Sequence, residues 1–450
     1  MTVSPAPSSK TTSTATELLP GHIGNLTAKE NAMLKQLWGR LLKLFEQKGT
    51  QIRPKQQEDN ASSTTSSKKG GWFSSKKETS EKDLFIGATT EPTLITLPLE
   101  KALPLIPGEV LRNTFWNMVA TDNPDAVVLR FLRARKWDLV AAYDMLTNAL
   151  RWRIVYRLDD LTALGENGLR DELNRLKPGM GDCFVSQLNA GKTFLGGPDK
   201  EGRGICFINV SYHHKEDQPA EVIKLLTMYI METSRAIVHQ PVDTACIVFN
   251  MDGFTLKNMD FDFVKFLVSC FEAYYPETLG CLCIHKAPWV FSTVWTLIQP
   301  LLDPVVATKI HFTKDLKELT HYVDIPSLPG NITGEKDKKT LDEAVDIDPV
   351  APGTLKKPDT AAFNDYQEMI KEHQIETADW IKTKSVDGDN FNMRRALATQ
   401  YRLARIRAEL DIRGPTRYQA KGMIQFTPEG RVILDFGSDG WQPLDITEMV

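Results

Sequence analysis

The feature that most constrains this chain is a series of short apolar segments alternating with helical patterns between residues 205 and 322. Apolar runs bounded by turn residues predict buried strands at 205–210, 244–251, 279–285 and 309–313. Apolar residues at helical spacing predict helices at 219–239, 263–274, 288–298 and 316–322. Strands that alternate with helices are typical of α/β domains with a mostly parallel sheet. The sequence therefore predicts the α/β class.

The whole sequence divides into four predicted regions, one of which holds this unit. Residues 1–107 are predicted to form an N-terminal extension, with one amphipathic helix at 26–48 and a disordered linker rich in serine and lysine. Residues 108–180 show helical periodicity and predict a small bundle. Residues 181–335 hold the α/β unit, and residues 336–450 are predicted to form a helical C-terminal extension ending in a hairpin.

Two predicted helices in these extensions carry patterns with more than one interpretation. In the first, Thr27 and Glu30 form a capping box, and the apolar stripe consists of Leu34, Leu37, Trp38, Leu41, Leu42 and Phe45. That stripe fits packing on the folded domain, membrane contact or a partner groove. The second helix, predicted at 391–412, carries many arginines. A solvated face is favoured over a binding face for them, namely for Arg394, Arg395, Arg402, Arg405, Arg407 and Arg413.

Composition excludes several classes of protein. A net charge of -4 over 450 residues gives no reason to expect nucleic-acid binding. The six cysteines are too sparse for a disulfide scaffold and predict reduced core residues in an intracellular protein. Cys281 and Cys283 have no second cysteine pair nearby, so no metal site is predicted. The sequence shows neither a signal peptide nor an apolar span long enough for a transmembrane helix.

The sequence contains no recognisable catalytic constellation. Gly191-Lys192-Thr193 resembles the end of a phosphate-binding loop, but Ser186 stands where that motif needs glycine. Neither a nucleophile elbow nor a His-Glu-x-x-His motif occurs, and His213 and His214 would face opposite sides of a strand. We therefore predict no catalytic residues, no cofactor and no enzymatic activity.

Two clusters stand out from the rest of the sequence. The segment 129–138 places four cations close together, and Arg135 and Lys136 would lie at a helix C-terminus, where the helix dipole favours positive charge. They form either a solvated helix end or a phosphate clamp. The second cluster, at 274–310, contains a stretch without charged residues at 287–302, followed by Lys309. An apolar, movable helix bordered by cations suits a lid over an amphiphile.

These clusters belong to a wider resemblance. Matching segments are Asp199-Lys200-Glu201-Gly202-Arg203, Tyr275-Pro276-Glu277, Ala287-Pro288 and Leu302-Asp303-Pro304-Val305. Together they resemble the CRAL-TRIO lipid-binding family, and in particular its fungal phosphatidylinositol transfer proteins with long N-terminal and helical C-terminal extensions. The resemblance covers about residues 110–335. It implies an N-terminal helical bundle packed on a lipid-binding domain, whose concave sheet floors a pocket gated by a helix.

The resemblance also implies site residues. The phosphatidylinositol head group would be bound by Arg135, Lys136, Glu277 and Lys309. The gate helix would present Phe291, Val294, Trp295, Ile298, Leu301 and Leu302.

The sequence departs from the family pattern at the sites that bind lipid head groups. Val306 replaces a threonine that helps to hold the inositol phosphate, and Thr278 replaces a basic residue. Ala245 and Ile247 replace a serine and a threonine that bind phosphocholine. Without those hydroxyls a buried phosphate would lose hydrogen-bond partners. We therefore expect the second ligand to be a sterol precursor or another neutral lipid in place of phosphatidylcholine.

The predicted function is binding of phosphatidylinositol in a gated hydrophobic pocket and its transfer or presentation between membranes, which would tune lipid metabolism and vesicle traffic. The predicted partners are phospholipid and, transiently, a membrane surface, and the protein is expected to be monomeric. It is expected in the cytoplasm, peripherally associated with endoplasmic reticulum, lipid droplets or other intracellular membranes. One alternative is a lipid-responsive scaffold that recruits a protein partner through its terminal extensions. A lipid-modifying enzyme is disfavoured because no nucleophile–base or metal set is present.

Overall fold

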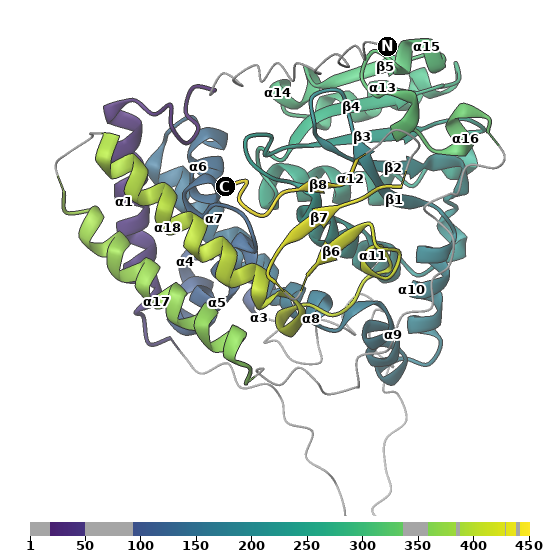
Figure 1. The fold of residues 1–450 in the computed structure, drawn as a ribbon. Helices are drawn as coiled ribbons and strands as arrows, with labels where there is room; N and C mark the ends of the chain where they lie inside the picture. The colour runs from purple at the N-terminus through teal and green to yellow at the C-terminus, as the bar shows by residue number, and fades with distance from the viewer. Residues whose placement is uncertain (1–18, 50–92, 336–358, 384–387, 428, 438–441) are drawn as a thin grey trace, which may run out of the picture.

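The computed structural model describes residues 19–49, 93–335, 359–383, 388–427, 429–437 and 442–450 (Figure 1). The serine- and lysine-rich linker predicted to be disordered lies outside these residues. Among the described residues, no helix combines the length and the apolar character needed to cross a membrane.

A five-stranded sheet organises residues 193–313. Its strands, which lie in sequence order, are β1 (Thr193–Pro198), β2 (Gly204–Asn209), β3 (Ala245–Asn250), β4 (Leu279–His285) and β5 (Ile310–Thr313). β1 is antiparallel to β2, and the other neighbours are parallel. The predicted α/β class with a mostly parallel sheet is therefore confirmed. β1 was not predicted because its Gly-Gly-Pro ending has low strand propensity.

The sheet separates two apolar regions, because successive side chains on a strand point to opposite faces. One face, which carries Ala245 and Ile247, looks toward α11 (Ala220–Ser234) and α12 (Phe261–Ser269) across a cavity. The other face, which carries Cys246 and Val248, packs in a separate core with residues of the segment 319–332. That segment contains η9 (Ile325–Ser327) and α16 (Gly330–Thr333) and begins at the end of α15 (Leu316–Leu319).

A helical layer lies beside the sheet. Its main helices are α1 (Ala28–Phe45), α5 (Gly108–Val119), α6 (Pro124–Ala134) and α7 (Leu139–Val155). Shorter helices around it are α3 (Thr93–Thr96), α4 (Leu99–Ala102), α8 (Leu158–Ala163), α9 (Gly165–Leu176) and α10 (Met180–Asn189). α1, α5, α6 and α7 share one buried core, so α1 is an integral part of this layer.

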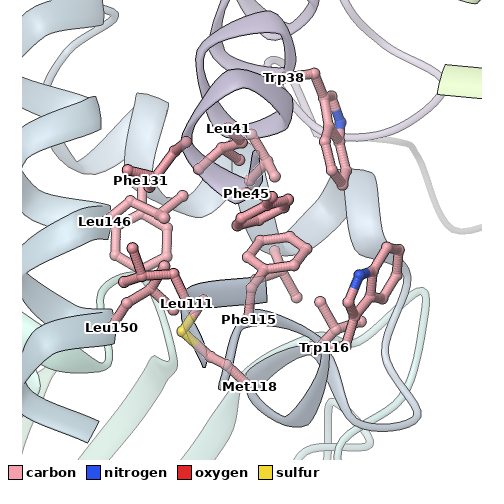
Figure 2. Close-up of a cluster of buried hydrophobic side chains, with 14 of the residues drawn as sticks. Trp38, Leu41, Phe45, Leu111, Phe115, Trp116, Met118, Phe131, Leu146 and Leu150 are labelled. Carbon is pink, nitrogen blue, oxygen red and sulfur yellow. The ribbon is translucent and has the colours of Figure 1, made fainter. Parts of the chain in front are cut away.

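The apolar stripe of α1 packs inside the folded protein. Figure 2 shows Trp38 and Phe45 facing Phe115 and Trp116 of α5. The rings of Trp38 and Phe115 meet edge to face, with centroids 5.5 Å apart. The capping box at the helix start is also present, since the Thr27 hydroxyl accepts from the Glu30 backbone N–H at 3.2 Å. Three interpretations were left open for the stripe, and the structure confirms the first, packing on the folded domain.

The C-terminal part contributes two long helices and a small sheet. Its elements are α17 (Ala361–Trp380), α18 (Gly388–Arg407), α19 (Glu409–Ile412), α20 (Arg417–Ala420), β6 (Ile424–Phe426), β7 (Val432–Leu434) and β8 (Leu444–Asp445). In Figure 1, α17 and α18 run side by side next to α1, and residues of all three share one core. The β6–β8 segment packs instead with helices of the 158–237 region. The domain boundaries at 107, 180 and 335 stay predictions.

The expectation of a solvated arginine face on α18 is wrong for Arg394, Arg402 and Arg405, which are buried. Arg394 forms a forked pair with Asp125 of α6, with Nη2 2.6 Å and Nε 2.9 Å from the carboxylate oxygens. Arg402 donates from Nε to the Thr447 carbonyl oxygen at 2.8 Å. A buried guanidinium is tolerated when its donors are satisfied, and the acceptors of Arg394 and Arg402 come from segments distant in the sequence. Arg405 pairs within its own region, with Glu409 four residues on.

Candidate functional site

A cavity of about 320 Å³ lies between the sheet and the helices that cover it. Its floor is formed by alternate side chains of the central strands, Ala245, Ile247 and Phe249 of β3 and Leu282 and Ile284 of β4. α11 and α12 supply further apolar wall, through Ile223, Leu226, Ile230, Phe263, Val264 and Leu267. Such a lining suits the hydrocarbon part of a ligand, because burying apolar surface is favourable.

The charge-free stretch predicted as a gate forms one wall of this cavity. It folds as α13 (Phe291–Ile298) and the short helix η8 (Gln299–Leu301). Four of the predicted gate residues line the cavity, namely Phe291, Trp295, Ile298 and Leu302. Val294 is buried in a neighbouring cluster with Met251 and Phe254, and Leu301 is partly exposed outside the lining. Movement of this wall stays a prediction.

Two of the predicted head-group residues, Arg135 and Lys136, follow the C-terminal end of α6. Both are exposed, and Lys136 has a positive φ of 51°. Arg135 Nη1 donates to the Ala134 carbonyl oxygen at 3.3 Å. Cations in this position interact favourably with the helix dipole.

The other two predicted head-group residues flank the start of β4. Lys309 donates from Nζ to the Leu279 carbonyl oxygen at 2.6 Å. Glu277, with a φ of 59°, places its Oε2 at 3.6 Å from Nε of Arg133 on α6. Arg133 therefore links Glu277 to the helix that precedes Arg135. Within the described residues, Glu277 pairs with Arg133, and no ion pair joins it to Arg135 or Lys136.

All four predicted head-group residues lie outside the cavity lining, but the lining reaches their neighbours. Thr278, Leu279 and Val306 all face the cavity. Glu277 precedes Thr278 in the chain and Lys309 contacts Leu279, so both residues border the cavity lining. The contact between Arg133 and Glu277 was not predicted. The position of Arg133 in the cationic segment at 129–138 could have indicated it.

The predicted second-ligand positions, Ala245 and Ile247, both line the cavity floor. Ile247 stands beside Cys206 of β2 and Leu282 of β4 in the strand register. The nearby Thr278 hydroxyl already donates to the Tyr275 carbonyl oxygen at 2.7 Å. The floor at these two positions is therefore apolar.

A buried ionic cluster behind the cavity wall was not predicted. Glu232 of α11 is completely buried and accepts two hydrogen bonds from Arg153 of α7, at 2.8 and 2.9 Å. It also accepts from the hydroxyl of Tyr275, a cavity-lining residue, at 2.6 Å and from Arg413 at 3.3 Å. Burial by itself would raise the pKa of Glu232, but Arg153 and the neighbouring arginines hold it well below its usual value. No local pattern reveals this cluster, because its members lie on separate elements.

A second polar region of the cavity contains His213. Its ring lies 5.6 Å from that of Phe263, and its Nε2 is 3.8 Å from the Asp260 carboxylate. Burial lowers the pKa of His213, which favours the neutral imidazole. The structure places His213 in the cavity wall.

Comparison with known families gives two matches. Residues 188–334 match the CRAL/TRIO domain, and residues 33–148 match the CRAL/TRIO N-terminal domain. The chain belongs to the CRAL-TRIO family. The N-terminal CRAL-TRIO match begins inside α1, which agrees with the packing of α1 in the helical layer.

Relatives of this CRAL-TRIO chain occur among fungi. A CRAL-TRIO domain-containing protein of Schizosaccharomyces pombe is 35% identical over 324 residues, covering 70% of this chain and 69% of the relative. Phosphatidylinositol transfer protein CSR1 of Eremothecium gossypii is also 35% identical, covering 71% of this chain and 72% of the relative. The SEC14 cytosolic factor of Candida glabrata is 27% identical, covering 49% of this chain and 72% of the relative. The predicted resemblance to the fungal branch is thereby confirmed.

Proposed function

We propose that this CRAL-TRIO protein binds phosphatidylinositol in the cavity beneath α13 and transfers or presents it between membranes. The observation that carries the proposal is the apolar cavity, one wall of which is a helix without charged residues. The similarity to a phosphatidylinositol transfer protein supports the choice of lipid. Exchange of the lipid is non-covalent, so the proposed activity requires neither catalytic residues nor a cofactor.

The proposed head-group site consists of Arg135, Lys136, Glu277 and Lys309 at the rim. The cations would meet the phosphate, and Glu277 would accept from inositol hydroxyls or hold a neighbouring cation. Charge-assisted hydrogen bonds of this kind are among the stronger ones in proteins. The location of Glu277 and Lys309 beside cavity-lining residues supports this assignment.

The proposed second ligand is a neutral lipid such as a sterol precursor. The apolar floor around Ala245 and Ile247 supports this choice, because it offers no hydroxyl to a phosphocholine group at those two positions. Transfer would require α13 to open at a membrane surface, as the protein acts from the cytoplasm on endoplasmic reticulum, lipid droplets or other membranes. The tuning of lipid metabolism and vesicle traffic belongs to the same proposal.

The scaffold alternative would use the terminal extensions to recruit a partner. The stripe of α1 is buried against α5, so it does not supply the partner groove that this alternative expected. The transfer proposal is therefore preferred.

The deciding experiment is purification of the full chain from its own cells, followed by mass spectrometry of the lipids that accompany it. We expect phosphatidylinositol and a neutral isoprenoid lipid, with little phosphatidylcholine. Abundant phosphatidylcholine would refute the neutral-ligand assignment while leaving transfer intact. A protein that carries no lipid, and moves none between liposomes, would favour the scaffold.

A further inference from the structure

The face of the sheet opposite the lipid cavity gathers three thiols and a carboxylate. Cys246 lies on β3, Cys281 and Cys283 lie on β4, and Asp199 follows β1. Cys246 and Cys281 are register partners on the adjacent parallel strands. All four residues are at most 5% exposed. They are separated from the lipid by the sheet itself, because side chains alternate between its faces.

The donor atoms of Asp199, Cys246 and Cys281 converge, and the Cys283 sulfur lies beside that of Cys281. One oxygen of Asp199 and the sulfurs of Cys246 and Cys281 all lie within 4.8 Å of one another. The Cys281 and Cys283 sulfurs are 3.9 Å apart. Residues two apart on a strand are separated by about 6.5 Å along its axis, so these two thiols have turned toward each other. A tetrahedral zinc ion with Zn–S bonds of about 2.3 Å would hold two sulfurs about 3.8 Å apart.

We propose that Cys246, Cys281, Cys283 and Asp199 bind one zinc-class divalent cation on the back of the sheet. Thiolates are soft ligands that select zinc over magnesium or calcium, and a carboxylate completes a four-coordinate set. Buried cysteines often serve only as small apolar side chains. The Asp199 carboxylate, whose burial is compensated by Arg203, brings an oxygen ligand to the same point as the thiols.

The surroundings of Asp199 are those of an oriented ligand. Its Oδ1 accepts from the backbone N–H groups of Glu201 and Arg203, both at 2.9 Å. Its Oδ2 accepts from Arg203 Nε at 2.6 Å. Hydrogen bonds of this kind fix a ligating carboxylate, and the Arg203 charge offsets part of the negative charge of the ligand set.

The proposed ion would join the β1–β2 turn, β3 and β4 beneath the floor of the cavity. Its ligands come from three separate segments, which is why the spacing of Cys281 and Cys283 alone did not predict a metal site. This proposal is independent of the lipid that the cavity holds.

The test uses the full chain, purified reduced and free of metal, then incubated with zinc chloride or magnesium chloride, desalted and measured by elemental mass spectrometry. We expect about one zinc ion per chain and no retained magnesium. Cys281→Ala should lose the zinc. Cys270→Ala is the matched control, because Cys270 is a buried cysteine in a different core cluster, and it should retain the metal. Cobalt in place of zinc should give a thiolate-to-cobalt charge-transfer band.

Three results would overturn the proposal. The first is wild-type protein that retains no zinc after desalting. The second is a folded Cys281→Ala variant that retains as much zinc as wild type. The third is a cobalt complex without the thiolate band. If Cys281→Ala does not fold, as judged by circular dichroism, the first and third measurements still decide the matter on wild-type protein.

Discussion

At the scale of single residues, Lys309 gives the sharpest test of the proposed head-group site. Its ammonium donates to the Leu279 carbonyl oxygen, and an ammonium has three donors, so it can also bind a phosphate oxygen. We expect Lys309→Ala to weaken phosphatidylinositol binding by about 1.5–3 kcal/mol, the range for a hydrogen bond to a charged group. Binding of a neutral lipid should be nearly unchanged. Competition between the two lipids in a liposome transfer assay measures both effects.

Lys314 provides the matched control, because it follows the other end of β5 and is exposed. Lys314→Ala should bind phosphatidylinositol like wild type. Equal losses in the two variants would mean that general surface charge, and not a site at Lys309, attracts the lipid. Equal loss of both lipids in Lys309→Ala would mean that the site is misplaced.

The cavity floor tests the choice of second ligand. The double variant Ala245→Ser, Ile247→Thr would add two hydroxyls to an apolar wall. An unpaired buried hydroxyl costs about 1–3 kcal/mol, whereas a bound phosphocholine could supply partners. We expect the variant to copurify with more phosphatidylcholine and less neutral lipid than wild type. An unchanged lipid profile, measured by mass spectrometry, would show that these positions do not control selectivity.

At the scale of elements, strong periodicity was predictable and long-range polar contacts were not. The stripe of α1 follows from its helical spacing, because burial of one face imposes that period. The apolar runs of β2, β3 and β4 are continuous because both faces of the sheet are covered. β1 escaped prediction because its pairing with β2, and not its own residues, makes it a strand. The cavity position of Ala245 followed from family resemblance. The burial of Arg394 and Arg402 and the Glu232 cluster depend on partners from distant segments, which no local pattern encodes.

The helix α17 carries a residue that should make stability depend on pH. His373 is buried between the rings of Trp38 and Trp116, with centroids 5.8 and 5.1 Å away. Burial, assisted by Arg394, lowers its pKa from 6.5 to about 3. The folded state therefore keeps it neutral, while the unfolded chain takes up a proton below pH 6.5. The contribution of His373 to stability is complete above that pH and is lost progressively between pH 6.5 and 3, by up to about 1.4 kcal/mol per pH unit.

The variant His373→Phe isolates this effect, because it keeps an aromatic ring in the same core. Urea unfolding at several pH values between 7.5 and 4 should give a shallower decline for the variant than for wild type. The variant loses the 3.3 Å contact between His373 and Thr377, so its stability near neutral pH is the baseline for comparison. Parallel profiles of unfolding free energy against pH would rule out His373 as a cause of the decline.

At the scale of the whole molecule, both extensions contribute to the cores that support the cavity. Trp38 of α1 donates to Asp125 of α6 at 2.7 Å, and Arg394 of α18 binds the same carboxylate. Arg417, near the C-terminus, forms a buried pair with Glu166 at 2.9 Å. A deletion of residues 1–107 or 336–450 would therefore remove buried partners and expose apolar cores. Point variants are the better tools for separating transfer from partner binding.

The Glu232 cluster connects the helical layer, the cavity wall and the C-terminal extension. Glu232 of α11 binds Arg153 of α7, Tyr275 at the cavity wall and Arg413 at the end of α19. Glu232→Gln keeps the size of the side chain but leaves Arg153 as a buried cation without its counter-charge. We expect unfolding free energy to fall by about 3–5 kcal/mol, the usual loss when one partner of a buried pair is removed. Glu376→Gln, at an exposed position of α17, should stay within about 0.5 kcal/mol of wild type. Urea unfolding monitored by tryptophan fluorescence measures both variants. If the two are equally stable, water or a rearranged Arg153 must compensate the lost charge, and the cluster would not hold the C-terminal extension to the cavity wall.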